Sequence, residues 1–158
     1  MYKIVGKSIL STACLALMLS GCGGKKKIQS PQASQQGLAL NKDSVEYFQK
    51  NVGDAVYFDF DKSNLSPEAK ATLAKQAAWL KEHPQYLKGV VVSGYCDAAG
   101  TEEYNMALGA RRSHEAKKVL SASGIASVKT TSLGKKEASN IGDGSKDRKA
   151  VTTIGASK

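Results

Sequence analysis

The apolar run from Ile9 to Leu19 indicates which part of this chain forms the folded protein. It follows Lys3 and Lys7 and ends in small residues before Cys22. A membrane-spanning helix needs about 20 apolar residues, so this run is too short for a span and is typical of a secretory signal. We therefore predict a signal peptide over residues 1–21, and the mature chain folds from the residues that follow.

Residues 19–22, "LSGC", resemble a bacterial lipobox. The motif predicts that Cys22 is lipidated on its sulfur, becomes the new N-terminus and is then acylated. An ordinary signal peptide with an incidental cysteine is the alternative. Gly23 stands where an acidic residue would favour retention in the inner membrane. We therefore expect a lipid anchor in the outer membrane and a domain that faces the periplasm.

The three cysteines do not predict a disulfide. Cys14 leaves with the signal and Cys22 carries the lipid, so Cys96 has no intrachain partner in the mature chain. We expect Cys96 to be a small, partly buried apolar residue, with a reactive thiol as the alternative. His83 and His114 show no spacing of a recognised metal site, and we predict neither a metal nor another cofactor.

The region after Cys22 is polar and predicts a linker. The chain has a formal net charge of +9 at pH 7, part of which lies in Lys25 to Lys27 beside the predicted lipid. Such a run adds attraction to anionic head groups, and the export signal argues against nucleic acid as a partner. Residues 22–43 are rich in Gln and Ser without an apolar period, which indicates a flexible tether. The folded domain is predicted over residues 44–158.

Apolar spacing and turn residues predict three helices and four strands in this domain. The clearest helix start is Ser66 as N-cap before Pro67, with Pro84 marking the end, and Gly124 stops the last helix. The order αβαβαββ predicts an α+β fold with helices packed on one face of a mixed β-sheet. The expected helices are 45–53, 67–83 and 101–124, and the expected strands are 55–60, 89–95, 128–134 and 150–155.

Four stretches of the domain carry a resemblance to a known family: "VYFDFDKSNLSPEA", "GYCDAAGTEEYNMALGARRSHEAKKVL", "LGKKEA" and "SKDRKAVTTI". In this order and spacing, and behind a lipobox, they resemble the lipoproteins of the OmpA C-terminal domain family over residues 44–155. The resemblance implies an OmpA-like domain that binds the peptidoglycan stem peptide noncovalently and recognises its meso-diaminopimelate residue. It also implies TolB and other Tol proteins as partners in keeping the outer membrane attached during cell division.

Asp97 and Arg112 are the leading candidates for ligand contacts. Diaminopimelate ends in an ammonium and a carboxylate on one carbon, which an acidic side chain and a planar guanidinium can bind together. The spacing of Asn105, Leu108 and Arg112 places them on one helix face. The resemblance implies contacts from Asp97 and Arg112. Further positions that match the family pocket are Phe60, Asp61, Thr101, Asn105 and Leu108.

Each of these residues also has a structural alternative. Asp97 could be a loop acid or a helix cap, and Arg112 could be a solvated side chain within a charged helix face. Asn105 favours bonds to nearby backbone, and Phe60 favours the core, to which we also assign Trp79. If the two charged residues serve a ligand, replacing either one should weaken binding and change stability little.

The chain departs from the family pattern around the candidate loop, where we expect weaker contacts with ligand or partner. A surface-exposed lipoprotein that acts mainly as an adhesin or interaction protein therefore remains an alternative. An enzyme is not expected, because His83 and His114 lie on predicted helices without visible partners. The departures from the family's usual residues are Tyr95, Ala98, Ala99 and Asp147.

Overall fold

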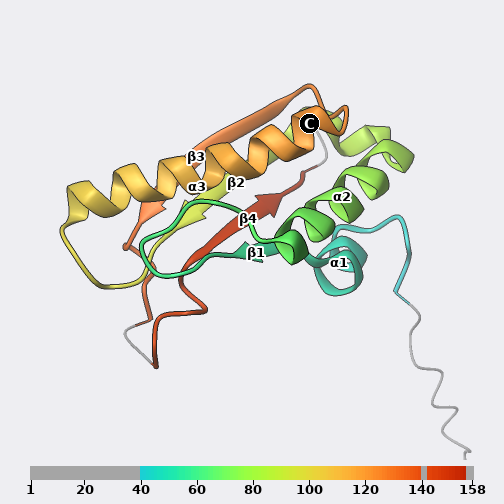
Figure 1. The fold of residues 1–158 in the computed structure, drawn as a ribbon. Helices are drawn as coiled ribbons and strands as arrows, with labels where there is room; N and C mark the ends of the chain where they lie inside the picture. Colours follow the sequence, from blue (N-terminus) through green and yellow to red (C-terminus); the bar gives the residue numbers. More distant parts are fainter. Residues whose placement is uncertain (1–39, 140–141, 156–158) are drawn as a thin grey trace, which may run out of the picture. The chain divides into compact units, whose positions relative to one another are not determined.

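The structure of the protein, a computed structural model, describes residues 40–139 and 142–155. The predicted signal peptide, the lipidation site Cys22 and the linker up to residue 39 lie outside the described residues. The elements follow the predicted order (Figure 1). They are α1 Val45–Tyr47, η1 Phe48–Gly53, β1 Ala55–Tyr57, α2 Pro67–Glu82, η2 Pro84–Gly89, β2 Val90–Tyr95, α3 Glu102–Ala122, β3 Val128–Gly134 and β4 Lys149–Thr153. The helix predicted over 45–53 is α1 followed by a π-helix, and a 3-10 helix is added after α2.

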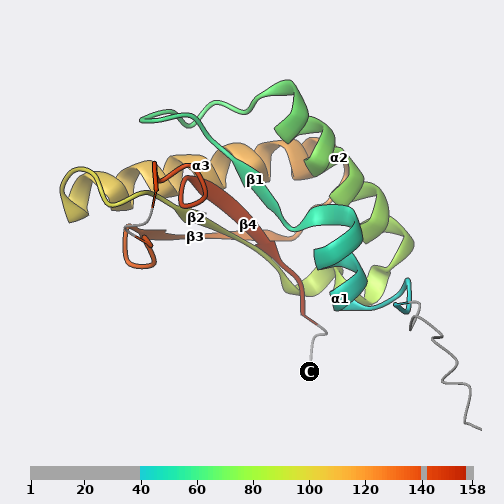
Figure 2. The ribbon, with the colours of Figure 1, turned by 90° about the horizontal axis from the view of Figure 1, so that it is seen from below.

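The strands form one mixed sheet in the order β1-β4-β2-β3. β2 and β3 are parallel, and α3 supplies the long crossover that a parallel pair needs, whereas β4 runs antiparallel to both β1 and β2. Figure 2 shows β4 between β1 and β2. The predicted mixed sheet is confirmed. Because β4 is the last strand and lies in the interior of the sheet, the segment that precedes it reaches the ends of β1 and β2.

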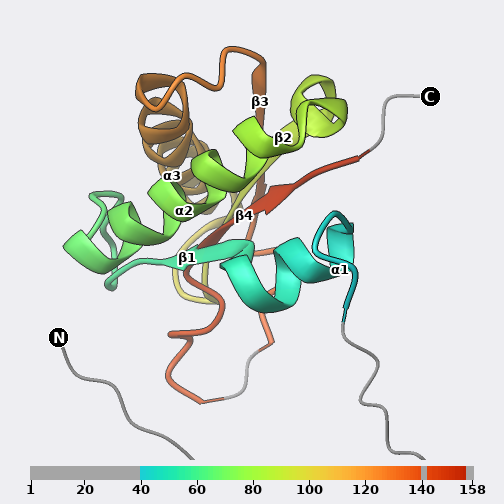
Figure 3. The same ribbon diagram turned by 90° about the vertical axis from the view of Figure 1, so that its right-hand side faces the viewer.

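The two long helices α2 and α3 lie on one face of the sheet, as predicted (Figure 3). On β4, Ala150 and Thr152 are buried while Thr153 is exposed, the alternation expected when one face is covered. Close packing of α3 on β2 depends on two glycines. A Cβ atom on Gly94 would lie 1.9 Å from the carbonyl oxygen of Gly109. Larger residues here would push α3 away from the sheet.

The predicted helix boundaries follow from local capping. The hydroxyl of Ser66 accepts a hydrogen bond of 3.1 Å from the Ala69 amide at the start of α2. Beyond α3, Gly124 adopts a φ of 92°, a conformation that favours glycine. Strand β1 ends at Tyr57, three residues earlier than predicted, because the chain then turns, with the Lys62 amide donating to the Asp59 carbonyl.

The segment just before α1 is attached to the domain. The Trp79 indole donates a 3.1 Å hydrogen bond to the Lys42 carbonyl, and the Tyr86 hydroxyl donates a 3.0 Å bond to the Asp43 carbonyl. Lys42 and Asp43, which the sequence assigned to the linker, thus contact the folded part. Trp79 is 6% exposed, which confirms its assignment to the core.

His83 has partners on both ring nitrogens, so the expectation that it lacks them is wrong. Nδ1 lies 2.6 Å from the Trp79 carbonyl oxygen and Nε2 lies 2.9 Å from a carboxylate oxygen of Asp43. A carbonyl and an ionised carboxylate only accept hydrogen bonds, so both contacts are satisfied together when the imidazole is protonated. Burial opposes this charge, but the bonds to Trp79 and Asp43 and the nearby Glu82 carboxylate outweigh it and raise the pKa of His83.

The raised pKa predicts that stability depends on pH. The His83 contribution is fully present below the unfolded-state pKa of about 6.5 and is lost as pH rises through the higher folded-state pKa. The melting temperature of the full-length protein should therefore exceed that of His83→Gln at pH 5.5, and the gap should shrink by pH 8.5. The exposed His114→Gln serves as the matched control.

The same titration has a spectroscopic readout. Trp79 is the single tryptophan of the chain, and its ring stacks on His83 with centroids 3.9 Å apart. Its fluorescence should change as the imidazole loses its proton in the wild type and in His114→Gln, and stay constant in His83→Gln. A stability gap that does not vary with pH would contradict the protonated form of His83.

Candidate functional site

A hollow of about 190 Å³, here called the α3 pocket, lies where three segments meet. They are the loop after β1, the loop after β2 and the N-terminal half of α3. Six of the seven predicted site residues line it, and the exception is Thr101. The lining residues are Phe60, Asp61, Asp97, Ala99, Gly100, Tyr104, Asn105, Leu108 and Arg112.

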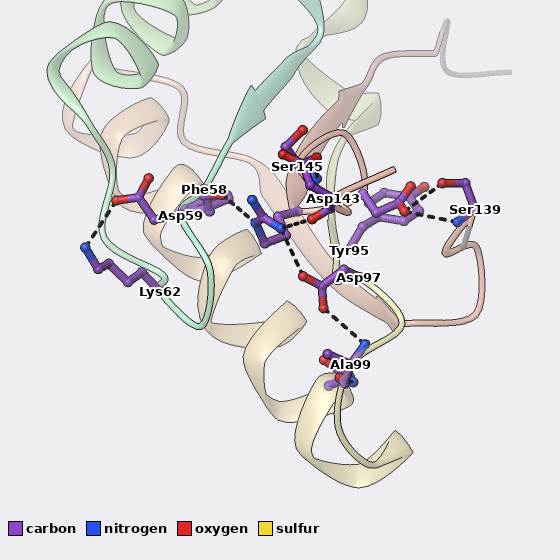
Figure 4. A network of polar contacts seen from close by, with 12 residues as sticks. Phe58, Asp59, Lys62, Tyr95, Asp97, Ala99, Ser139, Asp143 and Ser145 are labelled. Carbon is purple, nitrogen blue, oxygen red and sulfur yellow. Dashed lines mark hydrogen bonds and ion pairs between the residues drawn. The ribbon is translucent and has the colours of Figure 1, made fainter. Parts of the chain in front are cut away.

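Asp97 follows β2 and presents a largely buried carboxylate, whose side chain is 14% exposed. One oxygen pairs with Arg148 at 3.1 Å, and the other accepts a 3.3 Å hydrogen bond from the Ala99 amide. Figure 4 shows the contact with Ala99. The helix-cap alternative for Asp97 is wrong, because the hydroxyl of Thr101 caps α3 by accepting a 3.2 Å bond from the Tyr104 amide.

Arg148 is a site residue that the sequence reasoning missed. Its Nε donates to the Phe58 carbonyl at 3.2 Å, and its Nη1 donates to the Asp143 carbonyl at 2.9 Å as well as to Asp97. Arg148 therefore connects the end of β1, the loop after β2 and the segment before β4. The available signal was its place in "SKDRKAVTTI", one of the stretches that carry the family resemblance.

Arg112 lies on α3 and is completely buried, with 0% exposure. Its Nε, Nη1 and Nη2 donate to the carbonyls of Lys62, Tyr95 and Asp59 at 2.9, 2.8 and 3.2 Å. Its guanidinium carbon also lies 5.2 Å from the centroid of the Phe58 ring. Burial lowers the pKa of the Arg112 guanidinium. The solvated-face alternative is thus wrong. The three bonds also predict that loss of Arg112 costs stability, contrary to the expectation from the sequence.

Arg112 both fixes the loop after β1 and lines the α3 pocket. The carbonyls of Asp59 and Lys62 lie on either side of Phe60 and Asp61, so the guanidinium fixes the loop that carries both. These bonds use three of its five N–H groups and leave at most two for a ligand carboxylate. Arg112 is a structural residue whose remaining edge lines the α3 pocket.

Phe60 and Asp61 form the wall of the pocket that comes from the loop after β1. Phe60 is 64% exposed, so the core alternative is wrong for this residue. Asp61 has a φ of 57° and accepts a hydrogen bond from the hydroxyl of Tyr104. Tyr104, itself 45% exposed, was not among the predicted site residues. Nothing in its spacing pointed to a partner in another loop.

Asn105 on α3 and Lys135 after β3 hold the loop after β2 in place. The side-chain amide of Asn105 donates to the carbonyls of Ala99 and Thr101 at 2.6 and 3.0 Å, which confirms its structural interpretation. The Lys135 ammonium donates to the Gly100 carbonyl at 2.6 Å. Leu108 is 4% exposed and adds an apolar surface to the pocket. The loop is therefore fixed before any ligand arrives.

The positions that depart from the family pattern make contacts of their own. The buried carboxylate of Asp147 accepts hydrogen bonds from the Ser139 amide and hydroxyl at 3.1 and 2.8 Å. Figure 4 shows the two contacts at Ser139 as dashed lines. The Lys149 ammonium lies 5.4 Å from the centroid of the Tyr95 ring. Ala98 and Ala99 are exposed and line a second hollow of about 310 Å³. This hollow shares Phe60, Asp97 and Ala99 with the α3 pocket.

Cys96 lies directly before Asp97 and is 1% exposed, so it is buried more completely than predicted. Its thiol donates a 3.3 Å hydrogen bond to the Asn105 carbonyl, and burial raises its pKa. Across residues 40–139 and 142–155, no group of three or more His, Cys, Asp or Glu side chains could hold a metal ion. Over the same part of the chain, no helix has the length and apolar character to cross a membrane.

The pocket thus combines two carboxylates, one guanidinium edge and two exposed aromatic rings. Asp61 and Asp97 supply acceptors, Arg112 supplies donors, and Phe60 with Leu108 supplies apolar surface. Such a set is suited to a small group that carries an ammonium and a carboxylate on an aliphatic stem.

Comparisons with known proteins identify the same type of domain. The model of the OmpA family matches residues 57–152. The peptidoglycan-associated lipoprotein of Mesorhizobium japonicum is 40% identical over 148 residues, which cover 87% of this chain and 86% of that protein. The protein of the same name from Agrobacterium fabrum is 36% identical over 165 residues, covering 98% and 92% of the two chains.

A solved structure is also similar. The crystal structure of the peptidoglycan-associated lipoprotein from Burkholderia pseudomallei aligns with a TM-score of 0.61 and 31% identity, covering 68% of this chain and 96% of that chain. The fold and the resemblance predicted from the sequence are therefore both confirmed. By its sequence and its fold, this chain is a member of the OmpA family.

Proposed function

We propose that this protein binds peptidoglycan noncovalently and that the α3 pocket recognises the diaminopimelate residue of the stem peptide. The observation that carries the proposal is the presence of the Asp97 carboxylate and the Arg112 guanidinium in one small pocket. Relatives at 36–40% identity bear the name peptidoglycan-associated lipoprotein, which supports the same ligand.

The ligand chemistry matches the pocket group by group. The ammonium at the end of the diaminopimelate side chain donates to Asp97, and the neighbouring carboxylate accepts from the remaining N–H groups of Arg112. Phe60 and Leu108 contact the aliphatic stem. Because the Asp97 carboxylate is largely buried, a charge-assisted hydrogen bond to it is worth about 1.5–3 kcal/mol.

Arg148 sets the condition under which Asp97 accepts a ligand. In the unliganded pocket its guanidinium neutralises the Asp97 carboxylate at 3.1 Å, which offsets the cost of burying that charge. A ligand ammonium shares the carboxylate with Arg148, using the oxygen that otherwise accepts the long bond from the Ala99 amide. The net affinity is then the gain from the pair of the ligand ammonium with Asp97, less the loss in the pair of Arg148 with Asp97. We therefore expect each pocket to bind its ligand modestly.

The predicted lipid at Cys22 turns this binding into a tether. Lipid in the outer membrane and a domain on peptidoglycan, joined by the linker, would attach the membrane to the cell wall, and TolB and other Tol proteins are the proposed protein partners. We propose binding and not catalysis as the role of the α3 pocket, because the similar proteins bear the name peptidoglycan-associated lipoprotein.

Asp97→Asn should weaken binding to purified peptidoglycan sacculi by about tenfold or more, since it removes the charge that the ligand ammonium needs. The measurement is co-sedimentation of the full-length protein with sacculi over a range of concentrations. Asp59→Asn is the matched control, because the Asp59 carboxylate is exposed and does not line the α3 pocket. Equal binding by both variants would reject the pocket and favour the surface-interaction alternative.

Arg112→Ala should lower the free energy of unfolding by about 3 kcal/mol or more, since it removes three hydrogen bonds to a charged donor and empties a buried volume. The neighbouring Arg111→Ala, exposed on the same helix, should change it by about 0.5 kcal/mol or less. Urea denaturation of the full-length proteins tests both values. An Arg112→Ala variant as stable as the wild type would show that the guanidinium is not a structural support.

A further inference from the structure

The Tyr104 side chain lines the α3 pocket without a role in the contacts proposed so far. It lies in the first turn of α3, and its hydroxyl donates a hydrogen bond to the carboxylate of Asp61. Asp61 belongs to the loop after β1, 43 residues earlier in the chain. The bond therefore joins two separate walls of the pocket.

The backbone at Asp61 shows that this loop is held by its surroundings. Among the described residues, Asp61 alone combines a side chain with a positive φ, at 57°. Such a conformation is strained for a residue other than glycine and persists where other contacts impose it. Arg112 provides these contacts, through the carbonyls of Asp59 and Lys62 on either side.

Arg112 holds the backbone of the loop, but it does not fix the Asp61 side chain. Asp61 is exposed, and an exposed carboxylate rotates freely unless a partner holds it. The Tyr104 hydroxyl engages one carboxylate oxygen and leaves the other to accept a further bond. Thr101, which caps the turn that contains Tyr104, keeps the donor itself in place.

We propose that Tyr104 is a positioning residue that holds the Asp61 carboxylate as a second acceptor for the ligand ammonium, beside Asp97. The inference rests on the proposed function and specifies the ligand further. A primary ammonium has three N–H donors and can serve two carboxylates at once. The pocket therefore selects a free primary ammonium over an N-acetylated amine, and Tyr104 contributes to this selection through Asp61.

The test is a double-mutant cycle on the full-length protein with Asp61→Ala, Tyr104→Phe and the combined variant. Calorimetric titration uses two ligands. One is a tripeptide that ends in meso-diaminopimelate, and the other is the same tripeptide N-acetylated at the side-chain amine of its diaminopimelate residue. Tyr104→Phe keeps the ring and removes only the hydroxyl. It should lose roughly three- to tenfold in affinity for the free tripeptide, and the combined variant should bind no more weakly than Asp61→Ala alone.

Tyr57→Phe is the matched control, because Tyr57 is also an exposed tyrosine but does not line the α3 pocket. It should bind like the wild type. A ligand-free readout follows from the bond itself, since the Asp61 carboxylate raises the pKa of the Tyr104 phenol. In a ¹³C-tyrosine NMR titration, that pKa should fall in Asp61→Ala toward the ordinary value of about 10.

The outcomes separate this inference from the function on which it rests. Wild-type protein that binds the free tripeptide, with losses that add up in the combined variant, overturns the positioning role alone. An unchanged Tyr104 titration in Asp61→Ala does the same. Wild-type protein that binds neither the tripeptide nor sacculi overturns the proposed function and this inference with it.

Discussion

The three hydrogen bonds from the buried Arg112 guanidinium to backbone carbonyls are the interaction on which the pocket depends. They connect α3 to the end of β2 and to the loop after β1, so one side chain sets the distance between three segments. A buried charge is costly unless hydrogen bonds compensate it. The same bonds that make this burial tolerable therefore fix the loop that carries Phe60 and Asp61.

The rest of the fold brings these segments within reach of α3. The glycine pair Gly94 and Gly109 lets the helix approach β2 closely, and the interior position of β4 carries Arg148 to the pocket rim. Asp97 lines the same pocket as Arg112, which supports the loops, and pairs with Arg148, which neutralises its charge. A site of this kind is rigid before binding, so little ordering entropy opposes the ligand.

The sequence predicts the parts of this arrangement that depend on local rules. Helical spacing placed Asn105, Leu108 and Arg112 on one face, and the capping residue Ser66 marked the start of α2. Local rules do not predict contacts between residues far apart in the chain, such as those of Arg148 with Asp97 and of Tyr104 with Asp61. For the same reason the burial of Arg112 was missed, because its charged neighbours indicate solvent while its carbonyl partners come from distant loops.

The central claim is that a fixed pocket on α3 binds the zwitterionic end of diaminopimelate. The most direct measurement is a ¹⁵N NMR titration of the full-length protein with the meso-diaminopimelate tripeptide. We expect amide shifts that saturate together and cluster in the loops at residues 59–62 and 97–101 and at the start of α3. Saturable shifts that gather on another surface, or no shifts when sacculi do bind, would contradict it.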